Sequence, residues 1–181
     1  EYTVKAVESD EEMRLANALM AEQHAAETPV LRHWLLDLSH RYPGYRREHT
    51  RAVFLNYEAA SALRLTTDTI LLGEARLKMG GIGWVTTAER HRRKGLCRRL
   101  IDDAIDYMRH NNYHVSMLFG IPGFYHKFGY TTCLAEHMVR MATVDALTFH
   151  SPLKMREAKP GDIAALQKLH SANSAEAACS L

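Results

Sequence analysis

Residues 83–100 read GWVTTAERHRRKGLCRRL, and the rest of the chain is arranged around this stretch. It opens with aromatic and β-branched residues, 84–87, which are typical of a strand. It ends in a helix, since apolar residues from Leu96 to Met108 recur every three or four positions. Between them lies a turn rich in Arg and Lys, with Gly95 where the helix begins. Such a strand–turn–helix leaves backbone N–H groups open at the helix N-terminus, where they and the helix dipole attract an anion, most often a phosphate.

Three residue types in this turn favour an anion site. Gly95 lacks a Cβ atom, so a ligand can approach the backbone closely there. Cys97 is small and leaves the next amide open, while Arg92, Arg93 and Lys94 add positive charge. The turn is neither a Walker P-loop, which needs Gly-Lys-Ser/Thr, nor the G-x-G-x-x-G fingerprint of dinucleotide-binding folds. Taken alone, the pattern fits a solvated basic turn before an ordinary amphipathic helix equally well.

Two segments together resemble a known family. Arg92-x-x-Gly95-x-Cys97 resembles the Arg/Gln-x-x-Gly-x-Gly/Ala turn of the GNAT superfamily of acetyl-CoA-dependent N-acetyltransferases, and residues 124–130, FYHKFGY, resemble its later F-Y-x-K-x-G-F/Y segment. Residues 61–130 are most similar to the N-terminal domain of enhanced-intracellular-survival-type acetyltransferases. One departure is Cys97, which replaces the usual Gly or Ala and is small enough to fit.

The resemblance implies a fold and a set of site residues. The fold is α/β, of the layered α+β kind, with a mixed, mostly antiparallel central sheet, a splayed parallel strand pair and flanking helices. The co-substrate is acetyl-CoA, and Tyr125 is the catalytic group that faces the thioester sulfur. The residues expected to bind acetyl-CoA are Val85, Thr86, Thr87, Arg92, Arg93, Lys94, Gly95, Leu96, Cys97 and Arg98.

Acetyl transfer from a thioester to an amine sets chemical requirements. The carbonyl must be polarised, and a backbone N–H near Val85 is a candidate oxyanion donor. Proton transfer from a Tyr of pKa near 10 to a thiolate of pKa near 8.5 is uphill by roughly 2 kcal/mol in water, which favours a strong hydrogen bond from Tyr125 in a dry site. The base for the amine stays open among Glu58, Glu74 and several histidines. In the resembled type a carboxylate at the C-terminus of a later domain serves, a role we do not assign to Leu181.

The pattern of residues predicts an alternation of strands and helices. Ser9 and Glu12 form a capping-box pattern before a first helix. Pro29 opens a second helix, whose Val30, Leu31, Trp34, Leu35 and Leu38 we expect to face inward. We expect ion pairs between Arg98 and Asp102 and between Arg99 and Asp103. Strands are expected over residues 2–7, 51–57, 62–72 with a turn at 67–68, 74–87, 115–119 and 136–144.

Glycines interrupt the strand over residues 74–87. Gly80, Gly81 and Gly83 indicate a bulge, a close approach of another part of the chain, or a hairpin turn. A splayed strand here would let the pantetheine arm pair with residues 85–87 like an added strand. The crossover helix implies a parallel strand pair at the centre of the sheet.

The chain divides near residue 150. Residues 1–150 form the expected GNAT-like domain. Residues 153–170 repeat the strand, cap and helix order of residues 2–20. Residues 151–181 are therefore either a C-terminal extension or the incomplete start of a second, similar domain.

Composition narrows the function classes. The 181 residues are 46% hydrophobic and 24% charged, as in an ordinary globular protein, and the formal charge of +2 is too small to indicate a nucleic-acid binder. Three cysteines without a C-x-x-C pair favour a reducing cytoplasm, and eleven histidines without an H-E-x-x-H motif predict no catalytic metal. No apolar run reaches membrane-spanning length.

These observations predict an N-acetyltransferase that moves an acetyl group from acetyl-CoA to a primary amine by direct attack in a ternary complex. The alternative is a non-catalytic GNAT-like acyl-CoA-binding module of a larger protein, and a nucleic-acid binder using residues 90–99 is a distant third. The expected partner is a small-molecule or peptide amine, with no nucleic acid and no membrane, and a homo-oligomer stays open.

Overall fold

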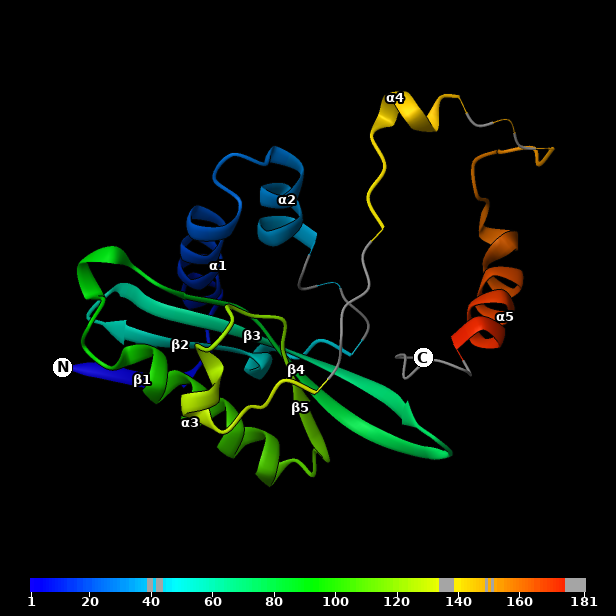
Figure 1. The fold of residues 1–181 in the computed structure, drawn as a ribbon. Helices are drawn as coiled ribbons and strands as arrows, with labels where there is room; N and C mark the ends of the chain where they lie inside the picture. The colour runs from blue at the N-terminus through cyan, green and yellow to red at the C-terminus, as the bar shows by residue number, and fades with distance from the viewer. Residues whose placement is uncertain (39–40, 42–43, 134–138, 149, 151, 175–181) are drawn as a thin grey trace.

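A single sheet forms the centre of the fold. The structure is a computed structural model, and it describes residues 1–38, 41, 44–133, 139–148, 150 and 152–174. Its five strands lie side by side in chain order: β1 (Tyr2–Ala6), β2 (Thr50–Leu55), β3 (Glu58–Leu72), β4 (Ala75–Thr87) and β5 (Val115–Met117). Neighbouring strands are antiparallel except β4 and β5, which are parallel (Figure 1). The predicted mixed, mostly antiparallel sheet with one parallel pair is confirmed.

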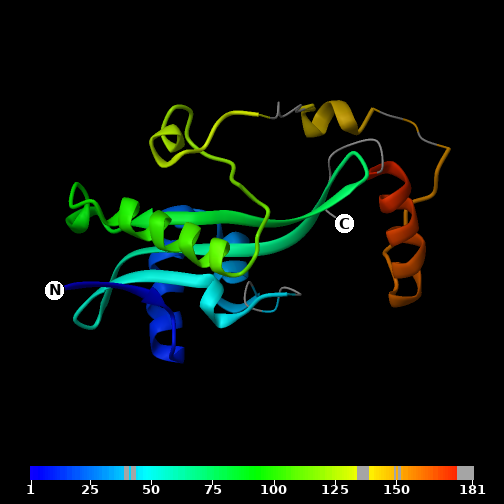
Figure 2. The same ribbon diagram turned by 90° about the horizontal axis from the view of Figure 1, so that it is seen from below.

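Helices cover both faces of this sheet. Figures 1 and 2 show α1 (Asp10–His24) on one face and α3 (Leu96–His110) on the other, which gives the expected layered architecture. The shorter helical segments between α1 and residue 128 are α2 (Pro29–His33), the π-helix η1 (Trp34–Leu38), and the 3-10 helices η3 (Arg47–His49), η4 (Glu89–His91) and η5 (Tyr125–Phe128). Beyond them, α4 (Thr143–Ala146), η6 (Pro160–Asp162) and α5 (Ile163–Ser174) lie apart from the sheet.

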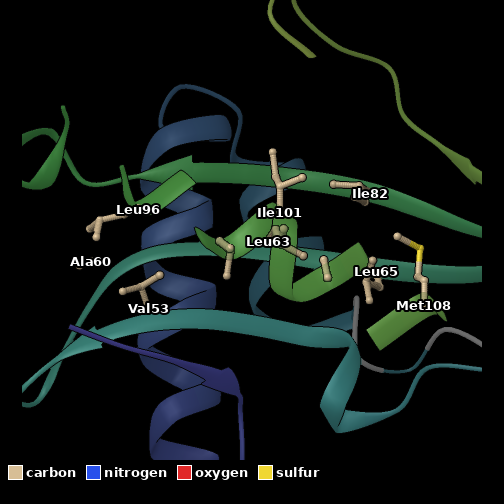
Figure 3. Packing of buried hydrophobic residues seen from close by; sticks show 10 residues of the cluster. Val53, Ala60, Leu63, Leu65, Ile82, Leu96, Ile101 and Met108 are labelled. Atoms are coloured by element: carbon tan, nitrogen blue, oxygen red, sulfur yellow. The ribbon is translucent and has the colours of Figure 1, made fainter. Parts of the chain in front are cut away.

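The side chains of β2 and β3 alternate between α3 and α1, because successive residues of a strand point to opposite faces. Val53, Leu63 and Leu65 pack against the apolar stripe of α3, as Figure 3 shows. That stripe consists of the buried residues Leu96, Leu100, Ile101, Ala104 and Met108. On the opposite face, Ala52, Phe54 and Ala62 pack against Ala16, Leu19 and Met20 of α1. The two helices thus bury two separate apolar layers.

Both long helices begin where the sequence predicts. The backbone N–H of Glu12 donates to Ser9 Oγ at 3.1 Å, and the Glu12 carboxylate accepts from the backbone N–H of Ser9 at 3.4 Å, which completes the capping box. The same carboxylate accepts from the Lys5 ammonium at 2.7 Å and so ties α1 to β1. On the other face, α3 begins directly after Gly95, which has the left-handed φ of 74°.

The glycines of β4 mark a close approach and a neighbouring bulge, and the alternative of a hairpin turn is wrong. A side chain on Gly80 would clash with Met108 of α3, and one on Gly81 would clash with Thr66. Further along, the register pairs Arg64 with Gly83 but Ala62 with Thr86, so Trp84 and Val85 both lie opposite Leu63. Trp84 has a φ of 58°. This bulge re-aims the end of β4.

Several predicted elements are absent or differently placed. β3 runs through Thr67 and Asp68, so the predicted turn there is wrong. β5 lies at the edge of the sheet that the structure describes, so the parallel pair is not central. Residues 139–142 and 153–159 form no strand, because no neighbouring strand pairs with them, and residues 136–138 of the predicted strand lie outside the described residues.

Some predicted side-chain placements are also wrong. Val30 is 81% exposed, because α2 packs only loosely at the end of α1. Trp34, the first residue of η1, is partly exposed, with its ring centre 5.7 Å from that of Trp84. Leu35 is buried as predicted, and Leu31 packs beside it. The side chain of Leu38 lies outside the described part of the chain.

The ion pairs expected along α3 do not form. Asp103 pairs with Arg51 of β2, while Arg98 and Arg99 donate to the backbone carbonyls of Lys127 and Tyr2. Carbonyls and charges on neighbouring elements compete successfully with partners one helical turn away, since such surface pairs contribute only tenths of a kcal/mol.

Candidate active site

A cleft opens where β4 and β5 diverge. The two strands pair only from Met79–Val115 to Gly81–Met117, after which β4 continues to Thr87 and β5 ends. The cleft has a volume of about 570 Å³, within the range of small-molecule sites. Its lining comes from the end of α1, the end of β4, the start of α3 and residues 121–127. Segments far apart in the sequence therefore meet here.

The N-terminus of α3 opens into this cleft without a cap. Gly95 is the N-cap residue and has no side chain to accept from the first-turn N–H groups. The first turn of α3 contains no acidic residue. Uncapped N–H groups and the positive end of the helix dipole make this end of the cleft suited to an anion.

The charged side chains that line the cleft are cationic. Arg92, Arg93 and Lys127 line it, and no Asp or Glu is among the described lining residues. Arg92 Nη2 donates to Gln23 Oε1 at 3.1 Å. Arg93, with a φ of 63°, makes no hydrogen bond or ion pair to any residue that the structure describes. The lining thus offers at least one guanidinium whose donors are available to a ligand.

Two predicted cations point elsewhere. Lys94 Nζ donates to the Tyr2 hydroxyl at 3.0 Å, and its side chain does not line the cleft. Arg98 donates to the Lys127 carbonyl at 3.3 Å, and its guanidinium lies 4.9 Å from the ring centre of Phe128. In this structure Lys94 therefore ties the turn to β1, and Arg98 ties α3 to η5.

Tyr125 lines the same cleft as the open end of α3. Its ring packs edge-on to Phe124 at 5.0 Å and to Tyr130 at 6.3 Å, and a side chain on Gly120 would clash with it. Burial, together with Cys97 and Tyr130 nearby, raises the pKa of the Tyr125 phenol above 10.0. Its hydroxyl makes no hydrogen bond to any described residue. Tyr125 is therefore a protonated phenol with an available donor.

Cys97 is also neutral in the cleft. Burial raises the pKa of its thiol, and the opposing influence of Lys127 and Arg98 does not reverse that direction. A buried neutral thiol is a poor nucleophile, since the thiolate is the reactive form. Cys97 is therefore a poor candidate for a nucleophile in this cleft.

The end of β4 presents two weakly engaged carbonyls at the cleft. The Val85 carbonyl faces His24 Nε2 at 3.3 Å, and the Thr87 carbonyl accepts from Arg92 Nε at 3.4 Å. Both distances are longer than the 2.7–3.2 Å of an ordinary N–H···O bond. By contrast, the Thr86 carbonyl points back into the sheet and accepts from Ser61 Oγ at 2.6 Å. An amide-bearing ligand could replace the two long bonds.

Most predicted site residues meet in this cleft. Those that line it are Val85, Thr86, Thr87, Arg92, Arg93, Gly95, Leu96, Cys97 and Tyr125. No local sequence pattern marks Gln23, His24 and His91 as cleft residues, because their positions depend on how α1 and η4 pack against the end of β4.

Neither of the two carboxylates considered as a base lines the cleft. Glu58 is paired with Arg90 and His91. Glu74 precedes β4 at the tip of the β3–β4 hairpin, roughly 35 Å from Val85 along an extended strand. His24 is a titratable group that does line the cleft, beside Val85.

Two absences hold for the described residues only. No group of three or more His, Cys, Asp or Glu side chains there could hold a metal ion. None of the helices in that part of the chain is both long and apolar enough to cross a membrane.

A comparison with protein families assigns the chain. The sequence model of the acetyltransferase (GNAT) domain matches residues 3–133, which include all of the sheet except Tyr2 and every residue that lines the cleft. The chain belongs to the GNAT family. A search of curated proteins found no match. The match ends at residue 133, and α4, η6 and α5, which follow it in the chain, lie apart from the sheet.

Solved structures share the GNAT fold at low sequence identity. A GCN5-related N-acetyltransferase from Anabaena variabilis ATCC 29413 matches with 17% identity and a TM-score of 0.56, over 71% of this chain and 31% of its own. Eis1 from Mycobacterium abscessus matches with 14% identity and a TM-score of 0.59, over 72% of this chain and 31% of its own. A GNAT family acetyltransferase from Brucella melitensis in complex with acetyl-CoA matches with 15% identity and a TM-score of 0.58, over 78% and 92%.

These identities show a shared fold alone. This GNAT chain spans about a third of the length of the Anabaena protein and of two further similar structures, from Enterococcus faecalis V583 and Kribbella flavida.

Proposed function

We propose that this GNAT domain binds acetyl-CoA and transfers its acetyl group to a primary amine by direct attack in a ternary complex. One observation carries the proposal: the uncapped N-terminus of α3 and the Tyr125 phenol line a single cationic cleft. The Brucella melitensis neighbour, which is in complex with acetyl-CoA, supports the choice of co-substrate.

Different residues of the cleft would bind different parts of acetyl-CoA. The backbone N–H groups after Gly95, with Arg92 and Arg93, would hold the diphosphate, since helix N-termini and guanidinium groups both favour phosphate oxygens. The edge of β4 at Val85 and Thr87 would pair with the amides of the pantetheine arm, in place of the long bonds from His24 and Arg92.

Two side chains would take part in proton transfer: Tyr125 as the donor and His24 as the acceptor. The amine nitrogen attacks the acetyl carbonyl carbon, the C–S bond breaks, and the Tyr125 hydroxyl donates to the departing sulfur. The raised pKa of Tyr125 keeps this donor protonated. When the pantetheine arm replaces the contact between His24 Nε2 and the Val85 carbonyl, the neutral imidazole keeps a nitrogen lone pair that can accept the amine proton. His24 is thus our candidate base.

A second candidate function is a non-catalytic CoA-binding module of a larger protein. The observation that favours it is the short span of this chain relative to three similar structures. This module would bind CoA without turnover, and Tyr125→Phe would then behave as wild type.

We further propose that residues 1–150 form the GNAT-like acetyltransferase domain and that residues 151–181 are a C-terminal extension or the incomplete start of a second, similar domain. The family match, over residues 3–133, lies entirely within the first of these two parts. A small-molecule or peptide amine remains the proposed acceptor, and the cysteine content remains our reason to propose the cytoplasm. Binding of nucleic acid is not part of this proposal.

Calorimetric titration with CoA tests the binding half. Wild type should bind, and Gly95→Glu should abolish binding, because a carboxylate would enter the anion site. Gly73→Glu is the matched control, since Gly73 has a φ of 60° at the tip of the β3–β4 hairpin and carries the same backbone strain far from the cleft. Equal binding by the two variants would contradict the proposed site.

A panel of amines, assayed for release of the CoA thiol, tests the catalytic half. At least one primary amine should release thiol faster than water does. Saturable CoA binding with no release from any amine in the panel would favour the non-catalytic module instead.

A further inference from the structure

A chain of hydrogen bonds runs beneath the turn of residues 92–95. Lys94 Nζ lies 3.0 Å from the Tyr2 hydroxyl, which lies 2.9 Å from His91 Nδ1. His91 Nε2 lies 2.6 Å from Glu58 Oε1, and Arg90 reaches the same oxygen at 2.6 Å. The chain links β1, β3, η4 and the turn. We refer to Lys94, Tyr2, His91 and Glu58 as the relay.

The chemistry of the two ends sets the direction of every bond in the relay. An ammonium only donates, so the Tyr2 oxygen accepts from Lys94 and the Tyr2 O–H is left to donate to His91 Nδ1. The proton of the imidazole is then on Nε2, where it is donated to Glu58. Burial acts to raise the pKa of the Glu58 carboxyl, but the hydrogen bonds from His91 and Arg90 outweigh it and hold the pKa below 4.5, so this end accepts.

Tyr2 also holds the start of α3. Its backbone carbonyl accepts from Arg99 Nη2 at 2.9 Å, and its ring packs edge-on to the imidazole of His91 at 5.7 Å. His91 is only 6% exposed. One residue of β1 thus contacts both sides of the turn: Lys94 and His91 through its side chain, and α3 through its carbonyl.

We propose, as an inference that rests on the proposed function, that Tyr2 and His91 are positioning residues for acetyl-CoA binding. Through the relay they hold residues 92–95 in the conformation that leaves the N-terminus of α3 uncapped and directs the Lys94 side chain away from the cleft. The backbone of this turn is left-handed at both Arg93 and Gly95. Only one of these is a glycine, so surrounding contacts must maintain the strained conformation at Arg93.

The relay acts on affinity and not on the chemical step. Of its members only His91 lines the cleft, and none is among our proposed proton donors and acceptors. Loosening the turn would disorder the diphosphate contacts while leaving Tyr125 in place. The expected signature is a higher KM for acetyl-CoA with an unchanged kcat at saturation.

The test is Tyr2→Phe, which keeps the ring and removes only the hydroxyl. CoA affinity, measured by calorimetric titration, should fall about three- to tenfold, the range expected for loss of one or two hydrogen bonds. Tyr57→Phe is the matched control, because Tyr57 is 95% exposed, and its affinity should equal that of wild type. A merely structural role for Tyr2 would lower the melting temperature and leave the affinity unchanged, which would overturn the inference.

A double-mutant cycle with Lys94→Met separates the relay from a direct contact. If Lys94 acts through Tyr2, the double variant should bind CoA no more weakly than the weaker single variant. Additive losses would show that Lys94 contacts the phosphates itself, contrary to the inference. Glu58→Gln, which retains an acceptor for His91, should bind more tightly than Glu58→Ala.

The same titrations distinguish this inference from the proposed function. Failure of wild type to bind CoA would refute the proposed function. Wild-type binding that Tyr2→Phe and Lys94→Met leave intact would refute the relay alone.

Discussion

Arg51 of β2 and Asp103 of α3 form a bidentate ion pair between the sheet and the helix. Arg51 Nη2 donates to Asp103 Oδ1 at 2.8 Å, and Arg51 Nε donates to Oδ2. The two side chains are mostly buried, and the guanidinium also lies 5.1 Å from the ring centre of Tyr107. This pair attaches the sheet to the helix whose N-terminus faces the cleft.

Replacing Asp103 by Ala should lower the free energy of unfolding by about 2 kcal/mol, because it leaves a mostly buried guanidinium without its carboxylate. Urea titration measures this loss. Asp106→Ala is the control, since Asp106 pairs with Arg109 on the exposed side of the same helix. Similar losses for both variants would mean that the Arg51 pair contributes no more than a surface pair.

Tyr125→Phe should reduce kcat about 100-fold at saturating acetyl-CoA, since it removes the proposed donor to the departing thiolate. Because burial raises the pKa of Tyr125 above 10.0, the phenol stays mostly protonated at pH 9, so the activity that depends on it should show no decline between pH 7 and 9. Thiol release measured across this range provides the check.

Tyr130→Phe is the control for that variant. Tyr130 packs beside Tyr125, does not line the cleft, and bonds Ser116 Oγ at 2.6 Å. It should lose some stability and keep its turnover. Equal losses of turnover in the Tyr125→Phe and Tyr130→Phe variants would contradict the role of Tyr125 as a proton donor and would indicate that it only packs.

His24→Gln should lower kcat while changing CoA affinity little. Glutamine can still donate to the Val85 carbonyl, but its amide cannot take up a proton at neutral pH. The pH dependence of kcat should lose its acidic limb in this variant. An unchanged profile would assign the base to another group.

Stability should fall as the pH is lowered below 6.5. Burial lowers the pKa of His49 below its ordinary value of 6.5, so the unfolded chain binds a proton more tightly than the folded chain does. The stability due to neutral His49 is therefore present above pH 6.5 and is lost as the pH falls through the lowered pKa. His49 Nδ1 accepts from the Arg46 backbone N–H at 3.2 Å, which favours the neutral ring.

Urea titrations at pH 7.5 and 5.0 would measure this loss, and His49→Gln should show a smaller difference between the two. A difference as large as that of wild type would place the effect in other groups.

Local sequence patterns predicted the two long helices, α1 and α3, and the turn at Gly95 that lines the cleft. The capping-box residues Ser9 and Glu12 predicted the start of α1. Gly95 and the apolar stripe that follows it predicted the bounds of α3. The segment containing Tyr125 was identified only through resemblance to a family. Each of these signals lies within a few consecutive residues.

Long-range contacts could not be read in the same way. His24 reaches the cleft because α1 crosses the sheet, and Arg51 outcompetes Arg99 for Asp103 because β2 passes beneath α3. The apolar alternation after residue 135 predicted a strand, but a strand needs a neighbour to pair with, and Val139 is 93% exposed. Sequence patterns report a residue's preference and not its partner.

The aromatic contacts beside the cleft give the protein an optical reporter. Its two tryptophans, Trp34 and Trp84, have ring centres 5.7 Å apart, and Trp84 also packs edge-on to the imidazole of His24. All tryptophan emission of the chain therefore arises at one place, next to the carbonyl that His24 contacts. A molecule that displaced His24 from Val85 would change the intensity of the tryptophan fluorescence, so occupancy of the cleft could be followed without any label.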